Sequence, residues 1–151
     1  MKIRFAVILL LALSVASCST VRLLRDPGTL PVTGRAERTR AKGALDYSVA
    51  IPIDAPREVV WQVLTDAPGY TKWNSTIVSL DGLIAQDSRL KLVAKVAPKR
   101  AFRRKVTTFD APSRMVWEDG NSMFLGVRTF TLEGLGGSTT FAIFQAPAAA
   151  G

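Results

Sequence analysis

The sequence predicts an α+β domain: one strand, two short helices and then a meander of about six antiparallel strands. Residues 44–53 alternate apolar and polar side chains, which is the period of a half-buried strand. The next residues, Asp54-Ala55-Pro56, combine a polar residue and a proline in the way typical of a helix start. Turn residues then recur at short intervals, and antiparallel hairpins are the usual connection at such spacing.

Two short helices are expected between the first strand and the meander. The apolar residues of the first helix recur at helical spacing, with an added tryptophan: Val59, Val60, Val63, Leu64 and Trp61. Residues 66–69 break this helix, and residues 70–73 predict a second helical turn. Helices this short need a sheet to pack against, because they are marginal alone.

The strands of the meander are expected at residues 77–84, 90–96, 101–109, 115–118, 122–132 and 138–144, with a hairpin turn at residues 119–121. The strand at 101–109 carries a basic cluster that begins at Lys99. Strand alternation places Arg100, Phe102 and Arg104 on one face of it. The opposite face then carries Lys99, Arg103 and Lys105.

The N-terminus has the features of a bacterial lipoprotein signal. Lys2 and Arg4 precede an apolar run that is shorter than the about 20 residues a spanning helix needs. The run ends in Val15-Ala16-Ser17-Cys18, which resembles the lipobox, where the cysteine receives a diacylglycerol and becomes the first residue of the mature protein. An ordinary secretory signal followed by an incidental cysteine is the alternative. Cys18 is the only cysteine, so no disulfide within the chain is expected.

We therefore expect a signal peptide at residues 1–17, a flexible basic tether at 18–43, one domain at 44–146 and a disordered tail at 147–151. The segment from Ser19 to Gly43 has six basic and two acidic residues, and such a segment is attracted to anionic headgroups. The expected location is the cell envelope, lipid-anchored, with the periplasmic face of a Gram-negative outer membrane preferred because serine follows Cys18. Nucleic acid is not expected as a partner of an exported, tethered chain.

The order of motifs from about Ala44 to Phe144 resembles the START-like polyketide cyclase/dehydrase and lipid-transport superfamily, SRPBCC. The matching residues are Ile53-Asp54-Ala55-Pro56, Val60-Trp61, Val63-Leu64, Asp66, Tyr70, Trp73-Asn74, Gly82, Phe102, Val106, Asp110-Ala111-Pro112, Val116-Trp117 and Phe130-Thr131-Leu132. The resemblance implies a helix-grip fold, in which a curved antiparallel sheet wraps around a long C-terminal helix. Between them the family has a cavity for a hydrophobic small molecule or a lipid.

The family's closing helix has no counterpart in the residues from Gln145 to Gly151, which are too few for a helix of roughly 20 residues. Either the chain is truncated or another element covers the sheet. An uncovered concave face predicts an exposed apolar patch, marginal stability or burial of the face in a homodimer.

The resemblance implies that large apolar residues on the concave face line the cavity. The candidates are Trp73, Leu92, Phe102, Val106, Trp117, Phe130 and Leu132, each with core packing as the alternative. The polar candidates are Asn74, Arg104 and Arg128, with exposure to solvent as the alternative for the arginines. The cluster around Arg104 could instead form a basic rim that contacts phospholipid headgroups.

The composition gives little support for catalysis. The chain has no histidine, and its one cysteine is the expected lipidation site, which removes the usual general base, thiol nucleophiles and most transition-metal ligand sets. Glu118 and Asp119 are adjacent, and adjacent strand residues point to opposite faces. We expect no catalytic residue, metal or cofactor. The expected function is a membrane-anchored carrier or sensor of a hydrophobic molecule; the alternatives are a cyclase/dehydrase-like enzyme and a truncated, inactive member.

Overall fold

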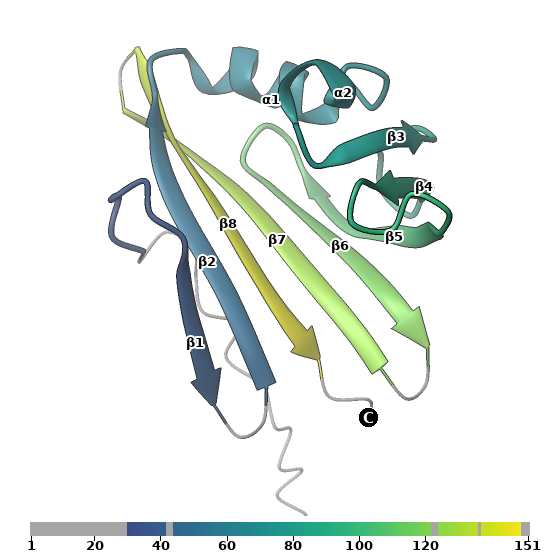
Figure 1. The fold of residues 1–151 in the computed structure, drawn as a ribbon. Coiled ribbons are helices and arrows are strands. Elements are labelled where there is room, and N and C mark those ends of the chain that lie inside the picture. The colour runs from purple at the N-terminus through teal and green to yellow at the C-terminus, as the bar shows by residue number, and fades with distance from the viewer. Residues whose placement is uncertain (1–29, 42–43, 122–123, 136, 149–151) are drawn as a thin grey trace, which may run out of the picture.

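The computed structural model describes residues 30–41, 44–121, 124–135 and 137–148. These residues form one curved antiparallel sheet of eight strands, with two short helices over one end of its concave face (Figure 1). The elements are β1 (Glu37–Ala41), β2 (Ala44–Ile53), α1 (Arg57–Thr65), α2 (Tyr70–Trp73), β3 (Ile77–Asp81), β4 (Arg89–Ala94), β5 (Ala101–Asp110), β6 (Arg114–Asn121), β7 (Phe124–Leu135) and β8 (Ser138–Ala148). The predicted strand, helix pair and six-strand meander are confirmed in that order.

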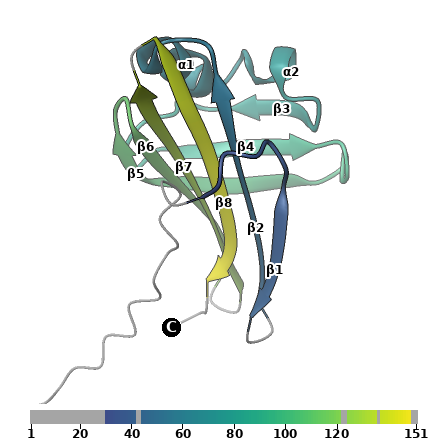
Figure 2. The same ribbon diagram turned by 90° about the vertical axis from the view of Figure 1, so that its left-hand side faces the viewer.

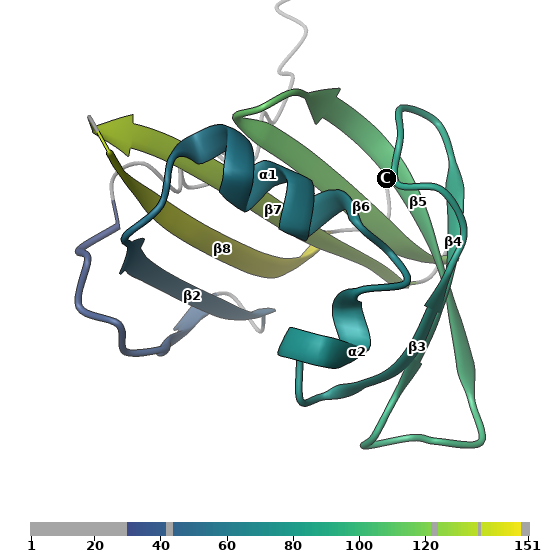
Figure 3. The same cartoon turned by 90° about the horizontal axis from the view of Figure 1, so that it is seen from above.

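The strand order is β1-β2-β8-β7-β6-β5-β4-β3, so the meander is closed by pairing of β2 with the last strand. Ile51 of β2 lies opposite Phe141 of β8 in this ladder. Figure 2 shows the sheet from the side, where β4 and β5 run across the direction of the long strands β7 and β8. The bend gives the sheet a concave face, and the helices lie on that side (Figure 3).

The main hydrophobic core fills the space between the helices and the concave face. Val60, Trp61 and Leu64 of α1 and Tyr70 of α2 are buried there against the strands. The Tyr70 hydroxyl donates a hydrogen bond of 2.8 Å to the Leu64 carbonyl oxygen, which joins the two helices. The core therefore holds the helix pair at one end of the concave face and leaves the other end to the strands.

The start of α1 differs from the expectation that Asp54 caps it. Pro56 occupies the N-cap position and makes no side-chain cap bond. The amide groups of Val59 and Val60 donate to the Pro56 carbonyl oxygen at 3.0 and 3.1 Å. The Thr139 hydroxyl of β8 donates to the Ala55 carbonyl oxygen at 2.7 Å, so the helix start is held by the sheet.

Strand β1 corrects part of the predicted tether, because residues 37–41 pair with β2 instead of forming a linker. An unpaired β2 would present a row of free backbone groups at the sheet edge, and β1 covers that row. Its side chains from Glu37 to Arg40 are all exposed, so the sequence carries no alternation that would reveal a strand. Leu30, also in the predicted tether, is buried with Ala50 and Ala142.

Two boundaries at the end of the chain also differ from the expectation. The turn predicted at residues 119–121 is wrong, because these residues continue β6 and pair with β7 as far as Phe124. The tail predicted at 147–151 is wrong for Pro147 and Ala148, which belong to β8, while residues 149–151 lie outside the described part. The β2–β8 ladder ends at Gln145, so Pro147 has a partner strand on the β7 side alone, a setting that tolerates proline. Within the described residues no long C-terminal helix follows the sheet, as expected.

Candidate ligand-binding site

A hollow of about 440 Å³ lies on the concave side, between the α2–β3 connection, the β4–β5 hairpin and β7. We refer to it as the inner hollow. Its lining residues are Ser75, Thr76, Ile77, Leu92, Ala94, Lys95, Val96, Phe102, Arg104 and Arg128. Four of the residues expected to line a cavity therefore meet here: Leu92, Phe102, Arg104 and Arg128.

Strand pairing explains why these side chains share the inner hollow. Leu92 of β4 lies opposite Phe102 of β5, and Leu90 lies opposite Arg104, so alternation directs all four to one face. The Arg104 guanidinium lies 6.0 Å from the centre of the Phe102 ring. The alternation predicted for Phe102 and Arg104 thus brings an apolar wall and a cation to one place.

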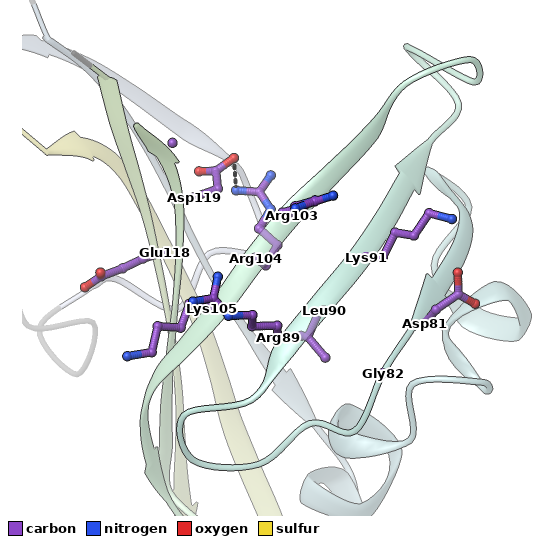
Figure 4. Close-up of a pocket in the computed structure, with 11 residues that line it drawn as sticks. Asp81, Gly82, Arg89, Leu90, Lys91, Arg103, Arg104, Lys105, Glu118 and Asp119 are labelled. Atoms are coloured by element: carbon purple, nitrogen blue, oxygen red, sulfur yellow. Dashed lines mark ion pairs between the residues drawn. The ribbon is translucent and has the colours of Figure 1, made fainter. Parts of the chain in front are cut away.

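Arg104 forms an ion pair with Asp119 of β6, and both side chains are largely buried, with exposed fractions of 12% and 17%. Figure 4 shows Arg104 reaching from β5 towards Asp119. Gly126 lies opposite Asp119 on β7, and a Cβ there would collide with the Asp119 carboxylate. The small residue at 126 therefore makes room for the carboxylate that pairs with Arg104.

Arg128 of β7 lies between Trp117 of β6 and Gln145 of β8 in the register of the sheet. Its Nε and Nη2 atoms donate to Gln145 Oε1 at 3.1 and 2.6 Å. No ion pair joins Arg128 to any residue that the structure describes. Burial lowers the pKa of Arg128 and the charge of Arg104 lowers it further, while Asp119 and Tyr70 act in the opposite direction.

The electrostatic balance of the site is positive, because two guanidinium groups share one carboxylate. Burial also lowers the pKa of Arg104, and Asp119 opposes this effect. Arginine still carries its charge at neutral pH, because the guanidinium group is not deprotonated in proteins under these conditions. In addition, Arg104 Nε is buried without a hydrogen-bond partner among the described residues. The site thus holds donors and positive charge in excess of its acceptors.

The other predicted site residues lie elsewhere. Val106, Trp117, Phe130 and Leu132 are buried in the main core and do not line the inner hollow. Trp117 and Phe130 pack with ring centres 4.9 Å apart. The alternative of core packing therefore describes their positions.

Trp73 and Asn74 lie at the helix pair. Trp73 is 43% exposed and borders a small hollow of about 90 Å³ on the α1 side, together with Val63 and Phe141. The backbone N–H of Asn74 donates to the Tyr70 carbonyl oxygen. The side-chain oxygen of Asn74 accepts from the hydroxyl and the backbone N–H of Thr76 at 2.7 and 3.1 Å. Asn74 thus ends α2 and shapes the loop that borders the inner hollow.

A second hollow, of about 650 Å³, lies where β5 and β6 separate (Figure 4). Its lining is rich in charged residues: Asp81, Gly82, Arg89, Leu90, Lys91, Arg103, Arg104, Lys105, Glu118, Asp119 and Gly120. Arg104 belongs to both hollows. Asp119 is not among the predicted site residues, because a turn was expected at residues 119–121. A strand that continues past Trp117 would place Asp119 on the same face as Trp117.

The described residues contain no group of three potential metal ligands from histidine, cysteine or carboxylate side chains. Glu118 accepts a hydrogen bond from the Thr107 hydroxyl at 3.2 Å, on the face opposite Asp119. None of the helices in this part of the chain is long and apolar enough to cross a membrane. Cys18 and residues 1–29 lie outside the described residues.

Solved structures with the same fold include CalU16 from Micromonospora echinospora, with 15% identity and a TM-score of 0.56 over 78% of this chain and 69% of that one. A START superfamily protein from Mycobacterium smegmatis has 18% identity and a TM-score of 0.57 over 69% and 77%. The di-domain ARO/CYC BexL from the BE-7585A biosynthetic pathway has 16% identity and a TM-score of 0.56, over 70% of this chain and 36% of its own. These similarities show a helix-grip, START-like fold.

No curated protein matches the chain by sequence. The family model described as polyketide cyclase/dehydrase and lipid transport matches residues 44–147, which covers β2 to β8 almost completely. Together with the curved sheet and the hollow on its concave side, this match supports a domain that binds hydrophobic ligands. The chain belongs to the polyketide cyclase/dehydrase and lipid transport family.

Proposed function

We propose that the protein is a membrane-anchored carrier or sensor that binds a hydrophobic small molecule or a lipid in the inner hollow. The observation that carries the proposal is the lining of this hollow, where Ile77, Leu92 and Phe102 form an apolar wall that ends at Arg104 and Arg128. A concave, mostly apolar site with a few convergent polar groups is the usual form of a small-molecule site.

A carrier fits the inner hollow better than an enzyme does. The two arginines stay protonated at neutral pH, so neither is suited to take up a proton. Tyr70 interacts electrostatically with Arg128, but its hydroxyl already donates to Leu64, and burial raises its pKa. A carrier needs no proton transfer, and a hollow of complementary shape and charge is sufficient for ligand binding.

The anchor is the lipid expected on Cys18, whose several acyl chains would hold the protein durably at a membrane. The tip of the β4–β5 hairpin supports exchange of ligand beside that surface. Val96 is 90% exposed and borders the inner hollow, and the exposed basic residues Lys95, Lys99 and Arg100 flank it. Basic side chains near an anionic membrane surface contribute about 1 kcal/mol each.

The binding proposal is tested by extracting the full-length chain from membranes and identifying co-purified small molecules by mass spectrometry. Ala94→Phe fills the inner hollow, and we expect it to lose the bound molecule. Val93→Phe places the same phenylalanine side chain on the opposite face of β4, and we expect it to keep the molecule. Absence of any bound molecule from the unsubstituted chain and from Val93→Phe alike would count against a carrier. Recovery of a chemically altered molecule would instead support a cyclase/dehydrase-like enzyme.

The anchoring proposal has a separate test. Mass spectrometry of the N-terminal peptide should show a mature chain that starts at Cys18 with acyl chains attached. Cys18→Ala should move the protein from the membrane fraction to the soluble fraction or leave the signal peptide uncleaved. A wild-type mature chain without acyl chains would overturn the anchor and leave the ligand proposal standing.

A further inference from the structure

The inner hollow contains a positive charge that the described residues do not neutralise. Asp119 is already bound to Arg104, and Gln145, the hydrogen-bond partner of Arg128, is neutral. The negative charge of Asp119 raises the pKa of Arg128, but the positive charge of Arg104 lowers it. Lys95 at the mouth of the hollow adds a further cation.

An uncompensated cation in a largely buried place is costly, and folded proteins normally pair such groups. In this site the lone Arg128 faces the same hollow as Arg104, whose Nε is buried and has no partner among the described residues. A guanidinium group binds an oxygen anion with two parallel hydrogen bonds, and two such groups around one hollow favour a carboxylate or phosphate between them. The two guanidinium groups therefore provide the donors and the positive charge that an oxygen anion in this hollow would need.

We propose that the inner hollow takes an amphipathic ligand with one anionic oxygen headgroup, a carboxylate or a phosphate ester, seated at Arg104 and Arg128. The apolar part of the ligand lies along Leu92 and Phe102, towards the exposed tip at Val96. This inference rests on the proposed binding function and adds the charge class of the ligand. A neutral hydrocarbon would leave the charge of Arg128 as it is, whereas an anion removes the cost of burying it.

The ligand class is tested with the full chain in nanodiscs of neutral phosphatidylcholine, with empty nanodiscs as the correction for partition into lipid. The probes are octanoate, octyl phosphate, 1-octanol and inorganic phosphate, and tryptophan fluorescence reports binding because Trp117 lies opposite Arg128. We expect octanoate or octyl phosphate to bind at least tenfold more tightly than octanol. Tighter binding of octanoate than of octyl phosphate would indicate a carboxylate ligand, and the reverse would indicate a phosphate headgroup. Inorganic phosphate should bind weakly because it lacks an apolar chain.

Arg128→Met keeps an unbranched, flexible side chain and removes the charge. We expect this variant to bind octanoate and octanol with similar affinity, while the melting temperature without ligand stays equal or rises, because a buried unpaired charge is gone. Arg103→Met, on the solvent side of β5, is the matched control and should keep the tenfold preference. A merely structural arginine would instead lower the melting temperature when replaced and leave the ratio of affinities unchanged.

The unsubstituted chain alone can decide the matter, so the test does not depend on the folding of a variant. Equal affinity for octanol and octanoate would overturn the anionic ligand and leave the carrier proposal intact. Absence of binding for octanol, octanoate and octyl phosphate would overturn both. An anion preference that survives in Arg128→Met would place the anion elsewhere and overturn the assignment to this pair of arginines.

Discussion

Arg104 and Asp119 form an ion pair immediately beyond the last backbone pair of their strands, Lys105 with Glu118. β5 and β6 diverge at this point, and the ion pair between Arg104 and Asp119 connects them where their backbone hydrogen bonds end. Because Arg104 lines both hollows, the pair also lies between the inner hollow and the one at the divergence of β5 and β6. The contact between β5 and β6 beyond their ladder and the charge beside the inner hollow thus involve the same two residues.

Asp119→Asn should destabilise the fold by about 2–3 kcal/mol, somewhat below the roughly 3–5 kcal/mol lost when one partner of a fully buried pair is removed. The physical reason is that Arg104 then loses its carboxylate partner, and Arg128 loses the nearby negative charge that favours its protonated form. Chemical denaturation measures the change. Asp87→Asn, which breaks the exposed pair of Asp87 with Lys105, is the control and should cause a much smaller change. Similar losses in both variants would show that Asp119 does not neutralise buried charge.

Gly126→Ala should destabilise the fold by about 1–3 kcal/mol, the usual cost of an added group in a well-packed place. The new Cβ would collide with the Asp119 carboxylate and push it away from Arg104. Gly137→Ala is the control, because a Cβ at that position meets no atom within 4 Å. If the two alanine variants unfold at the same denaturant concentration, Gly126 has no role in placing Asp119.

Tyr70→Phe should cost about 1–2 kcal/mol at neutral pH, because the buried Leu64 carbonyl loses its donor. Burial raises the pKa of Tyr70 above its ordinary value of 10.0, so the folded chain keeps this proton where the unfolded chain releases it. The stability of the wild type linked to this group is therefore constant below pH 10 and falls as the pH rises above it. Phenylalanine has no such proton, so the difference between wild type and variant should shrink above pH 10. Unfolding curves at pH 7 and pH 11 measure this difference in the free energy of unfolding. An equal difference at both pH values would mean that folding does not raise the pKa of Tyr70.

The helices expose an apolar patch formed by Val59, Val63 and Trp73, with exposed fractions of 48%, 50% and 43%. We expect the protein to bind a hydrophobic dye and to self-associate through this patch. Val63→Lys should weaken self-association at least tenfold and reduce dye fluorescence, as analytical ultracentrifugation and dye titration would show. Gln62→Lys adds the same charge at an exposed neighbouring position and should have little effect. A monomeric wild type that binds no dye would contradict self-association through this patch.

Much of the fold was predictable because its signals are local. The alternation of residues 44–53 predicted β2, and the spacing of Val60, Trp61 and Leu64 predicted the buried side of α1. The alternation around Phe102 also predicted that Arg104 shares its face. β1 escaped prediction because its side chains are polar on both faces and it is a strand only through its pairing with β2.

The sequence by itself therefore determined the order of the elements from β2 onward, the shared face of Phe102 and Arg104 and the presence of two arginines among the candidates. Only the tertiary structure decided that Arg104 has Asp119 as its partner while Arg128 has a neutral one, Gln145. It also decided that Leu92 and Phe102 border a hollow while Trp117 and Phe130 fill the core. The physical reason is that strand alternation is a property of neighbouring residues, whereas the bend of the sheet and the register of β6, β7 and β8 bring together residues far apart in the chain.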